Sequence, residues 1–258
     1  MFACNTISCM SFALNMKKTF LLGLLICCKL FGNPLMAQDI IQDSSSEVLA
    51  VSRSVNYYYK VIGENAHLYN GSEYIQTDSR IKGDPFFGSK EQQPGAIFYD
   101  GTLYSPVPVL YDILKDELVI DRYNAHFKIV LIKEKTDYFS FGGHKFIRVD
   151  PKADEEFPEA GYYDLLFDGK VRVLARYKKK IVESIYLAEG SSFVQENAYF
   201  LQRGTQYYPV KTKKAALAVF KDKRGEVSRY LRKSGIKFKD DPQNAMVSMA
   251  KYYDQIKN

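Results

Sequence analysis

The chain has 258 residues, including 20 Tyr and 17 Phe, and carries a formal net charge of +6. Its four cysteines all lie within the first 28 residues, so the rest of the chain excludes disulfides, a cysteine nucleophile and a thiolate metal site. Without cysteines, a domain must be stabilised by core burial alone. The aromatic residues can supply that core, because each buried ring removes roughly 150–250 Å² from water.

Residues 1–37 have the pattern of an export signal. Met16-Lys17-Lys18 supplies positive charge, Phe20 to Cys28 is apolar, and Leu35-Met36-Ala37 is an acceptable cleavage site. Nine apolar residues are far fewer than the roughly 20 that a membrane-spanning helix needs, which favours export over a transmembrane anchor. We expect a signal peptide over residues 1–37, with Met16 as an alternative start, and therefore an exported protein.

The next part of the chain has the features of a linker followed by a β domain. Residues 38–51 are polar and serine-rich, which predicts a linker. Many short strands follow over residues 52–210. Among the turns between them, Asp100-Gly101 and Asp168-Gly169 each separate two apolar runs and suit a two-residue hairpin with glycine at positive φ. The sequence predicts a mainly β fold, an antiparallel meander forming a sandwich or a partly open barrel.

The run that follows Asp168-Gly169 alternates between apolar and basic residues. Alternation with period two predicts a strand with one buried and one wet face. The buried face is expected to carry Val171, Val173, Ala175 and Tyr177, and the wet face Lys170, Arg172 and Arg176. Three consecutive lysines, Lys178-Lys179-Lys180, then predict a solvated turn.

Residues 211–258 differ from the β domain in both period and charge. They contain thirteen Lys and Arg against five Asp and Glu, a net charge of +8, which leaves the preceding domain acidic. Asp241-Pro242 is a typical helix start. The helix it begins has an apolar stripe at Ala245, Met249, Tyr253 and Ile256. We expect a basic helical tail that packs this stripe on the sheet and turns its basic face outward.

Two groups of residues are candidates for binding. Phe86 and Phe87 are adjacent large apolar residues in a loop, where one is expected to close the end of the core and a ligand contact is the alternative. Arg229, Arg232, Lys233 and Lys237 lie in the basic tail. Solvated helix faces are the favoured interpretation of these cations, and peripheral contact with an anionic surface is the alternative.

The sequence offers little support for an enzyme. No histidine has a second ligand-type residue at helical spacing, and there is no nucleophile elbow, phosphate loop or dinucleotide motif, so no metal or cofactor is expected. Four carboxylates could permit paired-carboxylate hydrolysis of the kind that glycosidases use. These are Asp100, Asp112, Asp116 and Asp121, of which Asp100 is already explained by its turn.

Several turns and aromatic motifs resemble those of an uncharacterised family of exported, β-rich proteins of Bacteroidota. They are Gly83-Asp84-Pro85-Phe86-Phe87, Tyr99-Asp100-Gly101, Leu110-Tyr111-Asp112, Gly161-Tyr162-Tyr163-Asp164 and the lysine-rich tail ending at Met249 to Asp254. The resemblance covers most of the chain beyond residue 37 and implies an exported bacterial envelope protein, located in the periplasm or on the outer surface of a Gram-negative bacterium. It does not imply an activity or a site.

Two classes of function therefore remain. The favoured class is a non-enzymatic envelope module that binds a protein, polysaccharide or lipid through its sheet or its basic tail, with no expected nucleic-acid partner. The alternative is a carboxylate-dependent hydrolase with its site in a β cleft. The alternative requires strand carboxylates that converge within about 5–10 Å of one another in a pocket.

Overall fold

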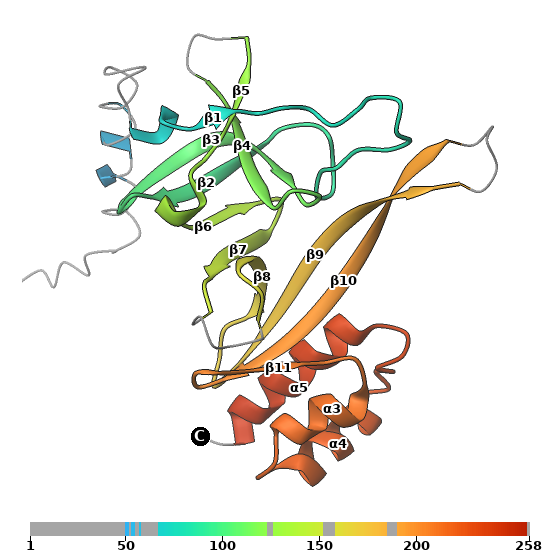
Figure 1. Cartoon of the computed structure of the whole chain (residues 1–258). Coiled ribbons are helices and arrows are strands. Elements are labelled where there is room, and N and C mark those ends of the chain that lie inside the picture. Colours follow the sequence, from blue (N-terminus) through green and yellow to red (C-terminus); the bar gives the residue numbers. More distant parts are fainter. Residues whose placement is uncertain are drawn as a thin grey trace, which may run out of the picture. The chain divides into compact units, whose positions relative to one another are not determined.

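A computed structural model describes most of the chain beyond residue 66 (Figure 1). The expected signal peptide over 1–37 and most of the expected linker over 38–51 lie outside the described residues. The described residues are 50–51, 53–54, 57, 67–122, 126–151, 158–184 and 190–256.

The prediction of a mainly β fold is confirmed, because the described residues contain eleven antiparallel strands in a single sheet that is not closed. Along the sheet the strand order is β1-β5-β4-β3-β2-β6-β7-β8-β9-β10-β11. The strands are β1 (Ser72–Glu73), β2 (Gln93–Tyr99), β3 (Thr102–Asp112), β4 (Glu117–Asp121), β5 (Lys128–Val130), β6 (Thr136–Phe141), β7 (His144–Val149), β8 (Gly161–Phe167), β9 (Val171–Glu183), β10 (Ser191–Arg203) and β11 (Gln206–Pro209).

The sheet consists of two meanders that meet between β2 and β6. Strands β2 to β5 run outward in one direction, and the chain then returns through the 3-10 turn η3 (Lys133–Lys135) to place β6 beside β2. Ile97 pairs with Phe139 across this junction, and both side chains are fully buried. The sheet also curls, since the Lys179 N–H in β9 donates to the carbonyl of Ile113 just beyond β3, at 2.9 Å.

The alternation predicted for β9 is confirmed on its apolar face, where Val171, Val173, Ala175 and Tyr177 are buried. On the other face Arg172 is exposed, but the expectation of a wet Arg176 is wrong, because carbonyl groups from Glu159 and Ala160 cover its guanidinium. The solvated turn at Lys178-Lys179-Lys180 is also wrong. These lysines continue β9, and the Lys179 ammonium donates to the carbonyls of Asp84 and Phe86 at 2.8 and 2.6 Å.

The two Asp-Gly turns differ in what requires their glycine. Asp100 and Gly101 have φ of 50° and 76°, so the positive-φ hairpin predicted there is confirmed. Gly169 also lies between two strands, but it has no positive φ, and the expectation for it is wrong. A Cβ at Gly169 would instead lie 2.2 Å from Oδ2 of Asp254, whose carboxylate accepts from the Lys170 N–H.

Substitutions at the two glycines are therefore expected to behave differently. Gly101→Val should lower the free energy of unfolding by about 1–2 kcal/mol, because a β-branched residue is strained in the left-handed region. Gly169→Ala should destabilise through its clash with Asp254, so Asp254→Ala should partly rescue it. Each glycine substitution is combined with Asp254→Ala in a double-mutant cycle, and denaturant unfolding measures the free energy of unfolding of each variant. We expect coupling to Asp254 for Gly169 and none for Gly101. Equal coupling for both glycines would contradict the assignment.

Three helices follow the sheet: α3 (Lys213–Val219), α4 (Arg224–Lys233) and α5 (Pro242–Ile256). Thr212 caps α3 by accepting from the Ala215 N–H, and Asp241 accepts from the Asn244 N–H at the start of α5. The stripe on α5 is buried at Ala245, Met249 and Tyr253 and partly buried at Ile256. These side chains share a core with residues of β9 and β10, and α5 lies against β8 and β9 (Figure 1).

Candidate functional site

Two adjoining clefts lie where the β9–β10 ribbon meets the helices. The first, here called the edge cleft, has a volume of about 890 Å³ and is lined from β8, β9, β10, the chain after β11 and the segment before α5. The second, here called the basic cleft, has a volume of about 690 Å³ and is lined by α4 and the segments flanking α3 and α4. Lys211 and Phe238 line both clefts, so the two are continuous.

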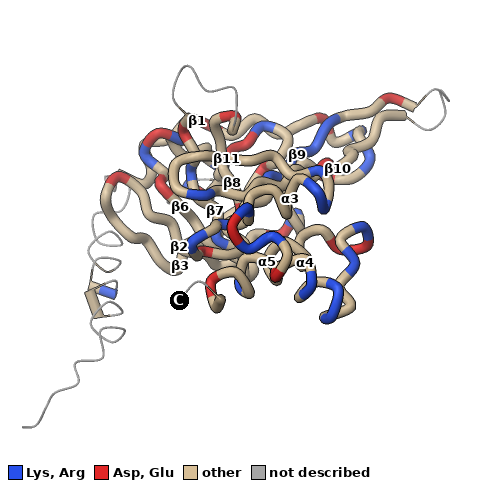
Figure 2. Tube along the Cα trace, turned by 90° about the horizontal axis from the view of Figure 1, so that it is seen from below, with Lys and Arg blue, Asp and Glu red and all other residues tan. Residues whose placement is uncertain are grey.

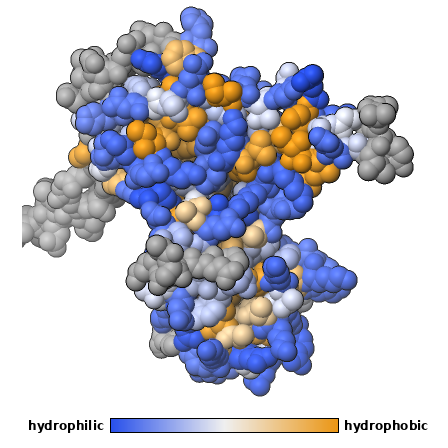
Figure 3. Space-filling model, viewed as in Figure 1, coloured by the Kyte–Doolittle hydropathy of each residue, from blue (hydrophilic) through white to orange (hydrophobic). Residues whose placement is uncertain are grey.

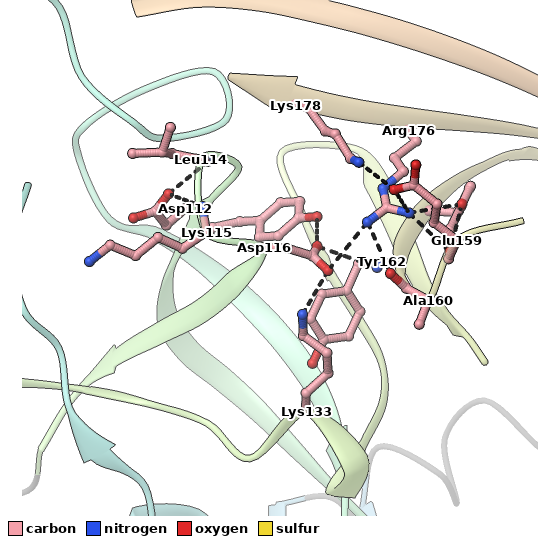
Figure 4. A network of polar contacts seen from close by, with 12 residues as sticks. Asp112, Leu114, Lys115, Asp116, Lys133, Glu159, Ala160, Tyr162, Arg176 and Lys178 are labelled. Carbon is pink, nitrogen blue, oxygen red and sulfur yellow. Dashed lines mark hydrogen bonds and ion pairs between the residues drawn. The ribbon is translucent and has the colours of Figure 1, made fainter. Parts of the chain in front are cut away.

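Arg176 forms part of the wall of the edge cleft and is held by the segment that precedes β8. Its guanidinium donates to the carbonyls of Glu159 and Ala160, each at 2.9 Å, and to the Tyr163 hydroxyl at 3.0 Å (Figure 4). The same group lies 5.1 Å from the centre of the Tyr163 ring. Arg176 is thus satisfied by carbonyls, an aromatic face and nearby carboxylates, which fixes this wall of the cleft.

Asp116 joins this wall to the turn between β3 and β4. Its carboxylate accepts from the Tyr111 hydroxyl at 2.6 Å and from the Lys133 ammonium at 2.7 Å, and it lies 3.9 Å from Arg176 (Figure 4). A Cβ at Gly161, where φ is 146°, would lie 2.4 Å from the Asp116 carboxylate. The backbone at Gly161 thus passes too close to the Asp116 carboxylate to leave room for a side chain, so this position requires glycine.

The basic cleft combines an apolar floor with a one-signed rim. Leu231, Ile236 and Phe238 supply its apolar part. No Asp or Glu of the described chain lines it, and none of its cations forms an ion pair with another described residue. The cations are Lys211, Lys213, Arg232, Lys237 and Lys239. Figure 2 shows Lys and Arg gathered around α4.

The four tail cations that the sequence offered as candidates are all exposed, but they do not act as one group. Arg232 and Lys237 line the basic cleft, whereas Arg229 and Lys233 do not. Sequence reasoning missed Lys211, Lys213 and Lys239, which reach the cleft from other segments. For Lys239 the available signal was the lysine on both sides of Phe238, which lines the cleft with it.

The structure places the two candidate phenylalanines away from both clefts. Phe87 is partly buried against the main core, with its ring edge-on to Phe146 and His144 at 5.1 and 4.9 Å. Phe86 packs on a small separate cluster with Tyr74 at 6.2 Å. Both contribute to packing, and neither lines the edge cleft or the basic cleft.

The four candidate carboxylates are each engaged in a structural contact. Asp100 accepts from Lys135 at 3.0 Å, and Asp121 from Lys128 at 2.5 Å. Asp112 is buried and accepts from the Tyr74 hydroxyl at 2.7 Å, while Asp116 holds the contacts given above. None of the four lines either cleft, so the geometry that the hydrolase alternative requires is not found at these residues.

A His–Asp pair that sequence reasoning missed lies beside Phe87. His144 Nδ1 is 2.6 Å from Oδ2 of the buried Asp164, which also accepts from the Tyr177 hydroxyl at 3.2 Å. Burial raises the pKa of Asp164, and its bonds to His144 and Tyr177 oppose that rise. The available signal was a carboxylate in an otherwise apolar strand. Within the described ranges, no group of three His, Cys, Asp or Glu is placed to hold a metal ion.

The fold and clefts define an open antiparallel sheet with a packed helical tail and a continuous groove at their junction. No family model matches the chain, and no curated protein or solved structure matches it either. None of the described helices has the length and apolar character needed to cross a membrane.

Proposed function

We propose that the protein is an exported, non-enzymatic binding module of the bacterial cell envelope that holds an anionic partner in the basic cleft. The observation that carries the proposal is that five cations line the cleft together with three apolar side chains, with no Asp or Glu of the described chain among the lining residues. Export is supported by the signal pattern in residues 1–37.

The arrangement favours binding over solvation for a physical reason. Cations on a freely solvated face usually alternate with acids or spread apart, because like charges repel. In the basic cleft they instead line one cavity together with Leu231, Ile236 and Phe238. An anionic partner placed there would gain Coulomb energy at the rim and bury apolar surface at the floor. Asp240 and Asp241 follow directly in the chain, yet they do not line the cleft, and Asp241 caps α5.

Reversing the charges of the cleft should weaken the binding of polyanions. We expect labelled poly-glutamate, dextran sulfate or phosphatidylglycerol vesicles to bind the full chain at low salt. Arg232→Glu with Lys237→Glu should weaken the binding about tenfold or more, because charge reversal replaces attraction by repulsion at the rim. Binding should also fall as salt rises, since the screening length shrinks from about 10 Å at 0.1 M to about 3 Å at 1 M.

A second pair of tail cations provides a matched control for this experiment. Arg229→Glu with Lys233→Glu makes the same charge change at exposed positions of α4 that lie outside the cleft. We expect less than about a threefold effect from this pair, since only diffuse electrostatics change. Equal weakening by both pairs would place the effect in the net charge of the tail, and failure of every polyanion to bind would refute the proposal.

A further inference from the structure

β10 has a stretch of unpaired edge that opens into the edge cleft. All thirteen residues of β10 pair with β9 on one side. On the other side β11 pairs only with Phe200–Arg203, and Lys82 bridges Ser192 near the opposite end of the strand. Between these two partners, residues 194–198 are exposed.

The unpaired stretch of residues 194–198 is here called the notch. The hydrogen bonds at its two ends show which backbone groups face outward. Lys82 donates to the carbonyl of Ser191 and accepts from the Phe193 N–H, at 2.9 and 3.2 Å. At the other end the Val210 N–H donates to the carbonyl of Tyr199 at 2.8 Å. The odd-numbered residues of β10 therefore direct their N–H and C=O groups away from β9.

The hydrogen bonds of β9 independently indicate the same orientation of the β10 backbone. The N–H of Lys179, the residue opposite Gln195, donates away from β10 to Ile113, so this pair exchanges no hydrogen bonds. Gln195 and Asn197 consequently present their N–H and C=O groups outward, with no partner for these groups within the described ranges.

The notch and the clefts form one continuous surface. Asn197 and Tyr199 line the edge cleft together with Val210, the residue at which the chain leaves the line of β11. The edge cleft continues at Lys211 into the basic cleft. The ribbon also exposes Val194 at one end of the notch and Ile181 and Val182 on β9, and Figure 3 shows apolar surface on this part of the molecule.

We propose that the partner is an extended acidic polypeptide segment that adds to β10 as a strand, in line with β11, and carries acidic groups into the basic cleft. This inference rests on the proposed function and specifies the chemistry of its ligand. Outward donors and acceptors that alternate with period two match the main chain of a strand, whereas a lipid or a polysaccharide has no such repeat. The unpaired backbone groups give affinity, and the five cations select for acidic sequences.

A proline at the centre of the notch tests the inference. The N–H of Asn197 faces away from β9, so Asn197→Pro removes a donor that the sheet itself does not use, and proline is tolerated at such edge positions. Asn197→Ala removes the side chain and keeps the donor, which makes it the matched control. Both variants should melt within a few degrees of the wild type, because each retains every bond between β9 and β10.

The probe is a phage-displayed library of acidic, β-prone peptides of about ten residues, selected on the full chain, with the selected peptides then titrated. We expect Asn197→Pro to weaken their binding about tenfold or more and Asn197→Ala to change it less than about threefold. Bound peptide should also protect the amides of Gln195 and Asn197 from hydrogen exchange while leaving those of Glu196 and Ala198 as they were. This difference in hydrogen exchange between odd- and even-numbered residues can be measured on the wild-type protein alone. The inference therefore stays testable even if Asn197→Pro does not fold.

The remaining outcomes separate the inference from the proposed function. If peptides bind but the two variants behave alike and no odd-residue protection appears, strand addition is refuted and the anionic module stands. If no peptide is selected while dextran sulfate or phosphatidylglycerol vesicles bind and respond to the Arg232 and Lys237 reversal, the inference is again refuted and the function stands. If no anion binds, both the inference and the proposed function are refuted.

Discussion

Replacing Arg176 by methionine is expected to lower the free energy of unfolding by about 2–4 kcal/mol. Methionine fills similar space but cannot donate, so the carbonyls of Glu159 and Ala160 lose their bonds to the guanidinium. Asp116 keeps Lys133 and the Tyr111 hydroxyl, which limits the loss. Denaturant unfolding of the purified full chain measures the effect.

Arg172 in the same strand provides the control. Its side chain is 44% exposed, and among the described residues it forms an ion pair with the exposed Asp168 alone. Arg172→Met should therefore change stability by about 0.5 kcal/mol or less. A loss as small at Arg176 as at Arg172 would show that the guanidinium is not needed to hold the segment before β8.

Gly161→Ala should destabilise the same cluster from the opposite side, because its Cβ would meet Asp116 and Arg176.

Local features of the fold were predictable wherever one physical cause acts on neighbouring residues. Pleating alone fixes which residues of β9 share a face, so the buried positions Val171, Val173, Ala175 and Tyr177 could be identified by alternation. The turn at Asp100-Gly101 follows from the positive φ that a tight hairpin requires. The stripe on α5 follows from the helical period.

Features that depend on distant partners were not predictable in this way. Arg176 is buried because the segment before β8 folds over it, and Lys178-Lys179-Lys180 stays in a strand because Lys179 reaches the loop at Asp84. The first half of β10, Ser191–Ala198, has no alternation, since little covers either of its faces. The position of β6 beside β2, rather than beside β5, is a choice of topology that no local pattern records.

The residues of the candidate site also differ in whether they could be predicted from local sequence features. Arg232 and Lys237 could be identified as binding candidates from charge alone, because a basic tail is visible in composition. The cleft around them could not, since it needs Lys211 and Phe238 brought together from segments 27 residues apart. The open notch in β10 is less accessible still, because an edge is defined by where the neighbouring strand stops.

Alkaline pH is expected to unfold the protein steeply, because six tyrosines have their pKa raised above 10, with burial as the largest cause. They are Tyr74, Tyr99, Tyr111, Tyr162, Tyr163 and Tyr177. Burial penalises the charged phenolate, and for Tyr111 and Tyr177 the neighbouring carboxylates Asp116 and Asp164 add to the rise. Each of these tyrosines holds its proton more tightly in the folded chain than in the unfolded one.

The sign of the effect follows from that difference. A group whose pKa is higher in the folded state contributes stability that is fully present below its unfolded pKa and is lost as pH rises above it. For these tyrosines the loss begins near pH 10, and each unit of pH beyond it costs about 1.4 kcal/mol per tyrosine that stays protonated only in the folded state. Because several tyrosines share this direction, the loss accumulates as pH rises above 10 and opposes an ordinary stability of about 5–15 kcal/mol.

Tyrosinate absorbance and far-ultraviolet circular dichroism, followed together from neutral to alkaline pH, test this expectation. The six buried tyrosines should ionise in one steep step that coincides with the loss of β structure, because these phenolates form only when the chain opens. Tyr111→Phe should lose a hydrogen bond at neutral pH and remove one ionising group, so its alkaline transition should be less steep. A gradual titration of all tyrosines near pH 10, with the β structure intact, would contradict the buried cluster.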